Sequence, residues 1–565
     1  MKRGFTLLLV VLAMLFAFSA ASAQDPTTFN GGWPYQPPPT GHFNQFAANN
    51  IIALGAYYPL MNPPLAVYHW DTGEYEGYLA DTLGFDADNN YVVTLKPGLK
   101  WSDGSAVTSA DVVTTFEVQY LLNNVVWKSM SKVEAVDDLT VKFTLTGPSK
   151  LVERQIVAQV NIGANSVYGD IAKMADPLIT AAKTSDDDGF KAALQALTDL
   201  RPAAPVASGP YVLDPASITA QNLTLVKNVG GLHAADVKFD QVRLWNGETE
   251  AVTPLVSNGD LWYGTYGFPP ATEKAFIDAG LDIIRGPFHS GPAIYFNYKV
   301  YPFDKVEFRQ AVAYIIDRDQ NGSVSLGQSG LAVGYMTGIG DSLVDSWVAD
   351  DVKAKLNTYD VDLDKATELL TGIGFTKGSD GKWLDDKGAP LAFTLEFPSD
   401  YTDWSAAAEN ALEQLNAFGF DITGNAVVST QEEPDVYNSN FQMAIRNWGA
   451  SSPFPGISWL EPFQRYNGQG LSAGQQVGGG INFNNDVTYS GGELNLLDAT
   501  IKSGQGLDVD AQKAIIDQIA LAYNELLPAI PLWERLGNNP LNRKFVNAPA
   551  SDDPIYLNPS SGTDS

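Results

Sequence analysis

Apolar residues recur along this chain with two different periods. Alternation over 91–95 (YVVTL) and 139–145 (LTVKFTL) predicts two strands, each with one buried face. Apolar residues spaced three or four positions apart predict helices over 306–317, 362–374, 404–419 and 511–528. A further helix is expected after Thr108, whose spacing to Asp111 is that of a capping box. Because strands and helices are interspersed, the pattern predicts a mixed α/β fold.

The first 23 residues have a different pattern. Lys2 and Arg3 precede an apolar run over 7–18, and Ala21-Ser22-Ala23 follows it. A short apolar run between a basic start and an A-x-A site is typical of a secretory signal peptide, so we expect cleavage after Ala23. The A-x-A site disfavours the alternative, a retained N-terminal anchor. The sequence therefore predicts a protein exported to the periplasm or another extracytoplasmic space.

Composition narrows the class of protein. The 565 residues contain no cysteine, which excludes a lipid-anchor cysteine, a disulfide framework and a thiolate metal site. The formal net charge of -30 disfavours nucleic acid and anionic lipid as partners. The four histidines have no metal-ligand spacing, so no metal or other cofactor is predicted: His42, His69, His233 and His289. A chain of this length is expected to form two or three structural units.

Catalysis is not indicated by the motifs. The chain has no H-E-x-x-H and no P-loop. Paired carboxylates are frequent in so acidic a chain and therefore do not identify a glycosidase. The sequence favours a binding protein over an enzyme.

The segment 441–459 (FQMAIRNWGASSPFPGISW) combines a predicted strand with an uncharged loop. Phe441, Met443 and Ile445 alternate with polar or small residues, as in a half-buried strand, and Trp448 follows in a loop of Gly, Ser and Pro. An indole face stacks well on the C–H face of a sugar ring, whose hydroxyl groups need polar partners. Trp448 is therefore a candidate sugar contact.

Five motifs occur in an order that resembles one family. They are YVVTLKPGLKWSDGSAVTSADVVTTFE (91–117), SGPYVL (208–213), FRQAVAYIIDRDQ (308–320), YDVDLDKATELLTGIGF (359–375) and LLPAIPLW (526–533). Together they resemble the family 5 extracellular solute-binding proteins, the receptors of ABC importers for oligopeptides, dipeptides, nickel and oligosaccharides. The resemblance covers nearly all of the expected mature chain.

This resemblance implies a fold and a partner. The fold is a two-lobed periplasmic-binding-protein (Venus-flytrap) fold of type II with an additional inserted domain. Lobe one is expected to comprise 24–60, 205–285 and 525–565, the additional domain 61–204, and lobe two 286–524. The implied partners are the membrane subunits of an ABC importer, and we expect the receptor to be a monomer. The resemblance also makes Trp101 a core residue.

The ligand is indicated by a departure from the family pattern. Peptide-binding members carry a W-x-x-D loop whose Asp pairs with the peptide ammonium group, and here that position is Ser451. The sequence therefore favours a neutral, β-linked, cellobiose-like oligosaccharide, with an oligopeptide receptor as the alternative. The candidate ligand-binding residues are aromatic platforms and their polar neighbours: Trp33, Trp262, Tyr263, Trp404, Arg446, Asn447, Trp448 and Trp459.

Overall fold

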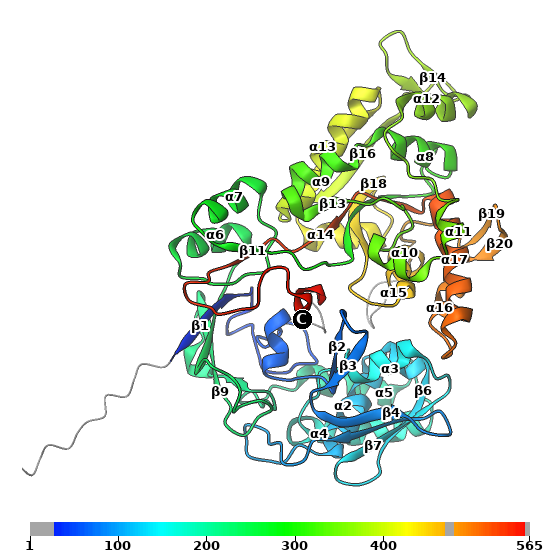
Figure 1. Cartoon of the computed structure of the whole chain (residues 1–565). Helices are drawn as coiled ribbons and strands as arrows, with labels where there is room; N and C mark the ends of the chain where they lie inside the picture. The colour runs from blue at the N-terminus through cyan, green and yellow to red at the C-terminus, as the bar shows by residue number, and fades with distance from the viewer. Residues whose placement is uncertain (1–26, 469–478, 560–565) are drawn as a thin grey trace, which may run out of the picture.

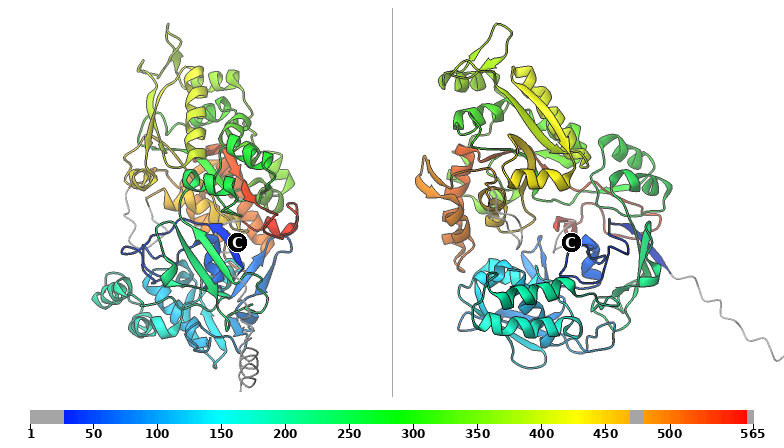
Figure 2. Two further views of the ribbon diagram at one scale, coloured as in Figure 1. Left: turned by 90° about the vertical axis from the view of Figure 1, so that its left-hand side faces the viewer. Right: turned by 180° about the vertical axis from the view of Figure 1, so that it is seen from behind.

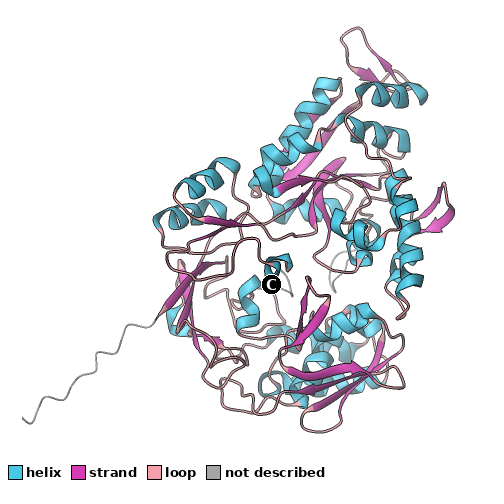
Figure 3. Ribbon diagram, viewed as in Figure 1, coloured by secondary structure: helices cyan, strands magenta, loops and turns pink. Residues whose placement is uncertain are grey.

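Three sheet-based units make up the computed structural model, which describes residues 27–468 and 479–559. Lobe one lies at one side, and lobe two and the additional domain extend from it above and below (Figures 1 and 2). Helices and strands are interspersed in the chain, which confirms the mixed α/β prediction (Figure 3). The predicted signal peptide and most of the Gly-rich stretch 468–480 lie outside the described residues.

Lobe one is built on a four-stranded sheet in the order β1-β10-β9-β8. Its strands are β1 (Thr28–Gly32), β8 (Tyr211–Leu213), β9 (Asn222–Lys227) and β10 (Gln241–Trp245), and its helices include α6 (Thr249–Asn258) and α7 (Pro270–Asp278). Strand β1 runs parallel to β10, and the other neighbours are antiparallel. Leu223, Leu225 and Leu244 anchor its apolar core.

The additional domain contains an antiparallel sheet in the order β4-β5-β7-β6. Its elements are β2 (Ala66–His69), β3 (Glu74–Gly77), β4 (Ala80–Phe85), β5 (Tyr91–Leu95), β6 (Met130–Ala135), β7 (Thr140–Leu145), α2 (Ser109–Leu121), α3 (Lys150–Val157), α4 (Asn165–Thr180) and α5 (Asp188–Asp199). Both predicted strands are present, and Thr108 and Asp111 form the predicted capping box of α2. Trp101 is buried in this core, as expected.

Lobe two is the largest unit and surrounds a five-stranded sheet in the order β17-β16-β18-β12-β21. Its strands are β12 (Ser290–Phe296), β16 (Ala392–Pro398), β17 (Asp421–Val427), β18 (Met443–Gly449) and β21 (Ala529–Pro531). Its longer helices are α8 (Val306–Ile315), α9 (Arg318–Leu326), α12 (Leu363–Gly372), α13 (Thr402–Phe418), α14 (Ser429–Tyr437), α16 (Leu496–Ser503) and α17 (Val509–Leu526). The four helices predicted from apolar periodicity are therefore confirmed as α8, α12, α13 and α17.

Shorter elements complete lobe two. They are α10 (Asp341–Trp347), α11 (Asp350–Lys353), α15 (Pro455–Leu460), the hairpins β14 (Thr376–Lys377)–β15 (Trp383–Leu384) and β19 (Asp486–Tyr489)–β20 (Gly492–Asn495), and the pair β13 (Gly330–Ala332)–β22 (Trp533–Arg535). No helix in the described ranges combines the length and apolar character needed to cross a bilayer.

Strand β18 differs from its predicted form. The alternation of Phe441, Met443 and Ile445 predicts one buried and one polar face, but Ala444 and Arg446 are buried as well. The reason is position: β18 pairs with β16 on one side and β12 on the other, at the centre of a sheet covered on both faces. Such a strand is buried throughout, whatever its alternation.

Two chain segments connect the lobes. Strand β11 (Asp282–Ile284) leads into β12, and β21 leads through β22 into β23 (Asn539–Leu541), which pairs back onto β11. From the sequence, the chain is expected to return to lobe one at residue 525. Because β21 pairs with β12 in the lobe-two sheet, the second crossing instead lies after Pro531.

The C-terminal segment contacts the additional domain. The side chain of Asn558 accepts a hydrogen bond from the Trp70 amide and donates one to the Tyr68 carbonyl oxygen, each at 2.9 Å. The indole of Trp70 in turn stacks on the ring of His289 in the first crossing segment, with centroids 4.4 Å apart. The β2–β3 hairpin is thereby held against the connection between the lobes.

Candidate functional site

A cavity of about 320 Å³ lies where lobe one meets lobe two. Lobe one contributes Trp33, Pro34, Glu248, Thr249, Thr265, Tyr266 and Gly267; lobe two contributes Asp400, Tyr401, Thr402, Asp403 and Trp404; β22 contributes Arg535. Two of the predicted aromatic platforms, Trp33 and Trp404, are therefore brought together from opposite lobes.

The position of Trp33 depends on a glycine. Trp33 directly follows β1, and its amide donates to the Trp245 carbonyl oxygen at 2.9 Å, which extends the pairing of β1 with β10. Gly55 lies against the indole: a Cβ at residue 55 would stand 2.2 Å from Trp33 Cζ2, and its φ of +53° is also unfavourable for other residues. Residue 55 must be glycine for the ring to occupy this place.

Trp404 belongs to the first turn of α13. The ring of Tyr401, the N-cap residue, meets the indole edge-on with centroids 5.5 Å apart. Aromatic pairs favour this edge-to-face arrangement, so Tyr401 restricts the orientation of the Trp404 ring.

The lobes meet at the backbone of Gly267. Its carbonyl oxygen accepts hydrogen bonds from Thr249 Oγ1 of lobe one at 3.4 Å and from Thr402 Oγ1 of lobe two at 3.5 Å. Both distances are long for hydroxyl donors, so the bonds are weak. We call this contact between the lobes at Gly267 the seam. Its weakness suits an interface that opens and closes.

The cavity has an excess of negative charge. The Asp400 carboxylate accepts hydrogen bonds from the Ser429 amide and hydroxyl group at 2.8 and 2.7 Å. Asp403 is only 7% exposed, and its Oδ2 atom has no hydrogen-bond partner among the described residues. Loss of hydration, followed by the negative charge of Asp400, raises the pKa of Glu248.

Arg535 supplies the cavity's positive charge. Its guanidinium carbon lies 4.7 Å from the centroid of the Phe288 ring, and its Nε atom has no hydrogen-bond partner in the described part of the chain. The Arg535 guanidinium and the Asp403 carboxylate both lie beside Gly267, 3.5 and 3.3 Å from the position a Cβ there would take. The absence of a side chain at Gly267 therefore lets both charged groups approach the seam.

A larger hollow of about 440 Å³ lies within lobe two. Residues of α8, α12 and α13, including Ile315, Leu363 and Phe418, line it, together with Asp317 and Lys377. It contains none of the predicted site residues and has no wall from lobe one, so it lacks the arrangement expected of a two-lobed receptor.

Trp262 and Tyr263 are packed within lobe one, outside the residues that line the cavity. The Trp262 ring stacks on Phe545 with centroids 4.7 Å apart, and its Nε1 donates to the Gly259 carbonyl oxygen. The Tyr263 hydroxyl group accepts a hydrogen bond from Asn539 Nδ2 at 3.3 Å. Burial raises the pKa of Tyr263 to about 12.

Trp448 and Trp459 are core residues in this structure. They are 1% and 0% exposed, and each indole N–H donates to a backbone carbonyl oxygen, that of Trp533 at 3.2 Å and that of Thr337 at 2.7 Å. Trp448 is buried because it lies in the central strand β18, where it pairs with Gly291 of β12. Neither ring presents a face to the cavity, contrary to the role expected from the sequence.

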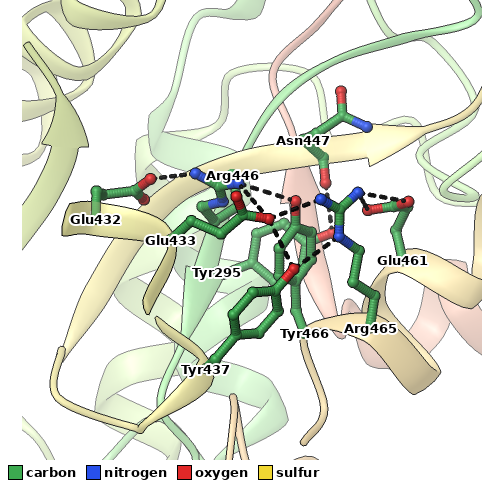
Figure 4. Close-up of polar contacts among 9 residues, drawn as sticks. All are labelled: Tyr295, Glu432, Glu433, Tyr437, Arg446, Asn447, Glu461, Arg465 and Tyr466. Atoms are coloured by element: carbon green, nitrogen blue, oxygen red, sulfur yellow. Dashed lines mark hydrogen bonds and ion pairs between the residues drawn. The ribbon is translucent and has the colours of Figure 1, made fainter. Parts of the chain in front are cut away.

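Arg446 and Asn447 are occupied by internal contacts (Figure 4). Arg446, 6% exposed, pairs with the fully buried Glu432 and donates through Nη2 to the Tyr466 hydroxyl group at 3.2 Å. Asn447 Nδ2 donates to the Gly449 carbonyl oxygen, and the Asn447 carbonyl oxygen accepts from Tyr295. In this arrangement Arg446 does not act as the ligand contact expected from the sequence, because its guanidinium group is paired with Glu432 and Tyr466.

The same network continues through a second arginine. Arg465 contacts Glu433 at 2.7 Å, Glu461 at 3.3 Å and the Tyr437 hydroxyl group at 2.8 Å (Figure 4). Burial opposes the charge of Glu433, but the hydrogen bond from Tyr437 and the two guanidinium groups lower its pKa. This network ties α14 and β18 to the turn that follows α15.

Sequence reasoning missed most residues of the cavity. Glu248, Tyr266, Asp403 and Arg535 were not candidates, because they come from four separate segments. The one signal present was the polar run SDYTDWS (399–405), which places two carboxylates and four hydroxyl groups around Trp404 at the start of a helix. No three His, Asp or Glu residues in 27–468 and 479–559 are grouped as a metal site requires.

Comparison with known proteins identifies relatives. Residues 74–470 match the profile of the bacterial extracellular solute-binding proteins, family 5, middle region. The chain is 27% identical over 402 residues to the glutathione-binding protein GsiB of Pectobacterium atrosepticum, covering 67% of this chain and 69% of that protein. It is 23% identical over 398 residues to a probable ABC transporter-binding protein of Deinococcus radiodurans, covering 64% of this chain and 63% of that protein. The matches thus span about two thirds of these relatives.

The fold has counterparts among solved structures. The periplasmic oligopeptide-binding protein of an oligopeptide ABC transporter of Thermotoga maritima superposes with a TM-score of 0.74 at 21% identity, covering 91% of this chain and 92% of that chain. The same Thermotoga maritima protein with bound mannohexaose gives a TM-score of 0.70, covering 92% and 93%. These similarities establish the two-lobed periplasmic-binding-protein fold.

Replacing Arg446 tests its structural role. Arg446→Met leaves the fully buried Glu432 without its partner, so we expect the free energy of unfolding to fall by about 3–5 kcal/mol. Denaturant unfolding measures the loss. The double variant Arg446→Met/Glu432→Gln should recover much of it, because the uncompensated charge is removed. An Arg446→Met protein of unchanged stability would contradict this assignment.

Glu396 should make stability depend on pH. Burial, followed by the negative charge of Asp435, raises its pKa to about 7, so its contribution to stability is full below the unfolded pKa and is lost as the pH rises through 7. The Glu396→Gln variant should be more stable than the parent at pH 8 by up to about 3 kcal/mol, with no difference near pH 4. Thermal unfolding across this range measures the effect.

The exposed Glu409, on α13, provides the control for this measurement. Glu409→Gln should leave the pH dependence of stability unchanged. Equal stabilities of the Glu396→Gln variant and the parent at pH 4 and pH 8 would show that Glu396 is not held in the proton-bound form.

Proposed function

Because the chain belongs to the bacterial extracellular solute-binding proteins of family 5, we propose that it is the exported receptor of an ABC importer and carries a β-linked, cellobiose-like oligosaccharide between its lobes. One observation carries the choice of ligand: indoles from opposite lobes, Trp33 and Trp404, line a single cavity. Flat aromatic rings contributed by both lobes suit a ligand with apolar faces, and a sugar ring has such faces.

The other cavity residues support the same ligand class. Thr249, Thr265, Thr402 and two tyrosines supply hydroxyl groups, which can both donate to and accept from a sugar. The volume of about 320 Å³ falls within the range of roughly 300–1,000 Å³ for small-molecule sites. The Thermotoga maritima relative crystallised with mannohexaose is a further argument that this fold can carry an oligosaccharide.

Ligand binding would favour the closed form of the receptor. A ligand that touches Trp33 and Trp404 at once gains contacts only when the lobes are together, so it shifts the population toward closure. The weak hydrogen bonds at Gly267 contribute little without it. We infer that the membrane subunits recognise the closed, monomeric receptor.

An oligopeptide is the second candidate ligand. The buried carboxylate of Asp403 favours it, because a peptide amino terminus would pair with this group. The similarity to glutathione-binding proteins points in the same direction.

A ligand screen separates the two candidates. Thermal shifts are measured with cello-, manno- and xylo-oligosaccharides, α-glucans, dipeptides, longer peptides and glutathione, because a ligand of the native state raises the melting temperature. Stabilisation by a β-linked oligosaccharide, followed by calorimetric titration, is the expected result. Stabilisation by peptides with none from any sugar would overturn the proposal.

Removing either cavity indole should weaken sugar binding. Trp33→Ala and Trp404→Ala are each expected to lower the affinity at least tenfold, about 1.4 kcal/mol, because a stacking surface is lost. Calorimetry with the sugar identified in the screen measures the change. Trp262→Ala is the control, since this indole stacks on Phe545 outside the cavity, and it should bind normally once shown to be folded.

Gly55→Val tests the support of Trp33. A side chain at residue 55 would collide with the indole, so the variant should bind sugar about as weakly as Trp33→Ala. The two changes should not add in the double variant, because both act on the same ring. Additive losses would show that Gly55 acts independently of Trp33.

A further inference from the structure

The charges of the interlobe cavity are not balanced within the protein. Three carboxylates, those of Glu248, Asp400 and Asp403, face one guanidinium group, that of Arg535, which gives a formal charge of −2. Asp400 is partnered by Ser429, but no ion pair joins Asp403 to Arg535, although both lie beside Gly267. A neutral sugar would leave this excess charge in place.

Of the three carboxylates, Asp403 is the one that is buried without compensation. It is more than nine-tenths buried, it lines the cavity, and its Oδ2 atom has no hydrogen-bond partner in the described residues. The amino end of α13 stabilises a carboxylate in the first turn only partly. A buried charge without a partner is strongly destabilising unless another group compensates it.

Tyr266 provides a separate indication of a missing polar partner. This residue lines the cavity from lobe one and is 6% exposed, and its hydroxyl group also lacks a hydrogen-bond partner among the described residues. This hydroxyl group lies beside Gly32 of β1, 2.8 Å from the position that a Cβ there would take. Buried hydroxyl groups are normally hydrogen-bonded, so a bound molecule that reached this point would supply the partner.

The surrounding rings suit a cation. Trp33, Tyr266, Tyr401 and Trp404 all line the same space as the carboxylates. A cation over an aromatic face is attracted by the negative charge of the ring face, most strongly for tryptophan. An ammonium group beside an apolar surface is thus the chemistry that satisfies both the rings and Asp403.

We propose that the sugar unit bound in this cavity carries a free amino group, so that the ligand is a β-linked oligosaccharide containing an amino sugar, with its ammonium group on Asp403. This inference rests on the proposed function and specifies its substrate class. An amino sugar keeps the C–H faces that stack on Trp33 and Trp404, and it replaces one hydroxyl group by the ammonium group. A peptide terminus offers the same ammonium group, but a zwitterionic peptide has no net positive charge to offset the excess on the cavity.

Three disaccharides with the same linkage test the inference. They are β-1,4-linked cellobiose, the β-1,4-linked glucosamine dimer and its di-N-acetylated form, which differ only in the group at C2. Calorimetry at pH 6.5 and low salt is expected to show the amine dimer binding at least tenfold more tightly than the other two. The preference should shrink as salt is added, because the attraction is electrostatic.

Variants locate the charge responsible. Asp403→Asn should reduce the preference for the amine dimer over cellobiose to within about threefold, and Glu248→Gln, at an exposed position, should reduce this preference partly. Asp170→Asn removes the same charge from the additional domain and should have no effect. Circular dichroism establishes that each variant is folded, and Glu248→Gln remains informative if Asp403→Asn is not.

The outcomes distinguish this inference from the proposed function. Equal affinity for cellobiose and the amine dimer overturns the inference and leaves an oligosaccharide receptor. A preference that survives both Asp403→Asn and Glu248→Gln also overturns it. Binding of dipeptides or glutathione with no binding of any disaccharide overturns both.

Discussion

The two lobes are joined by two short chain segments, and beside the cavity they touch through the backbone of Gly267, which accepts one long hydrogen bond from each lobe. The arrangement of the charged groups at the site and the ease of lobe closure both depend on this limited contact. Because residue 267 has no side chain, Asp403 of lobe two and Arg535 of the crossing strand can both reach the seam. The protein's own contacts across it are weak, so the free energy of closure is left for a ligand to supply.

The interiors of the lobes contrast with this seam. In lobe two, Arg446 and Arg465 are enclosed by Glu432, Glu433 and Glu461, and each arginine pairs with two of these carboxylates and contacts a tyrosine (Figure 4). At the cavity, Asp403 and Tyr266 keep unpartnered polar atoms within the described chain, and in lobe two Arg446 Nε and Glu432 Oε1 do so as well. Buried polar groups are costly when unpaired. The two places differ in access, because Asp403 and Tyr266 line the cavity, where a ligand can bind, whereas Arg446 and Glu432 lie inside lobe two.

Sequence patterns predicted the regular elements and part of the site. The helices α8, α12, α13 and α17, the capping box at Thr108 and the strand at 91–95 depend on local spacing, which a single sequence contains. The environment of Trp448 does not depend on local spacing. Whether a strand is buried on one face or on both is decided by its neighbours in the sheet, which are β12 and β16 here. Trp33 and Trp404 line the cavity, but their partners from 248–267 and 535 become adjacent only after folding.

The contact between Asn558 and the β2–β3 hairpin has a consequence for biogenesis. Trp70 and Tyr68 precede Asn558 by 488 and 490 positions, so nearly the whole chain separates the hairpin from the residue that binds it. Because synthesis proceeds from the amino end, these two hydrogen bonds can form only once residue 558 has been made, when the residues of both lobes and of the additional domain are already present. Loss of Asn558 would remove both hydrogen bonds but would leave the stack of Trp70 on His289, so the hairpin is fastened by two contacts that reach it from widely separated parts of the chain.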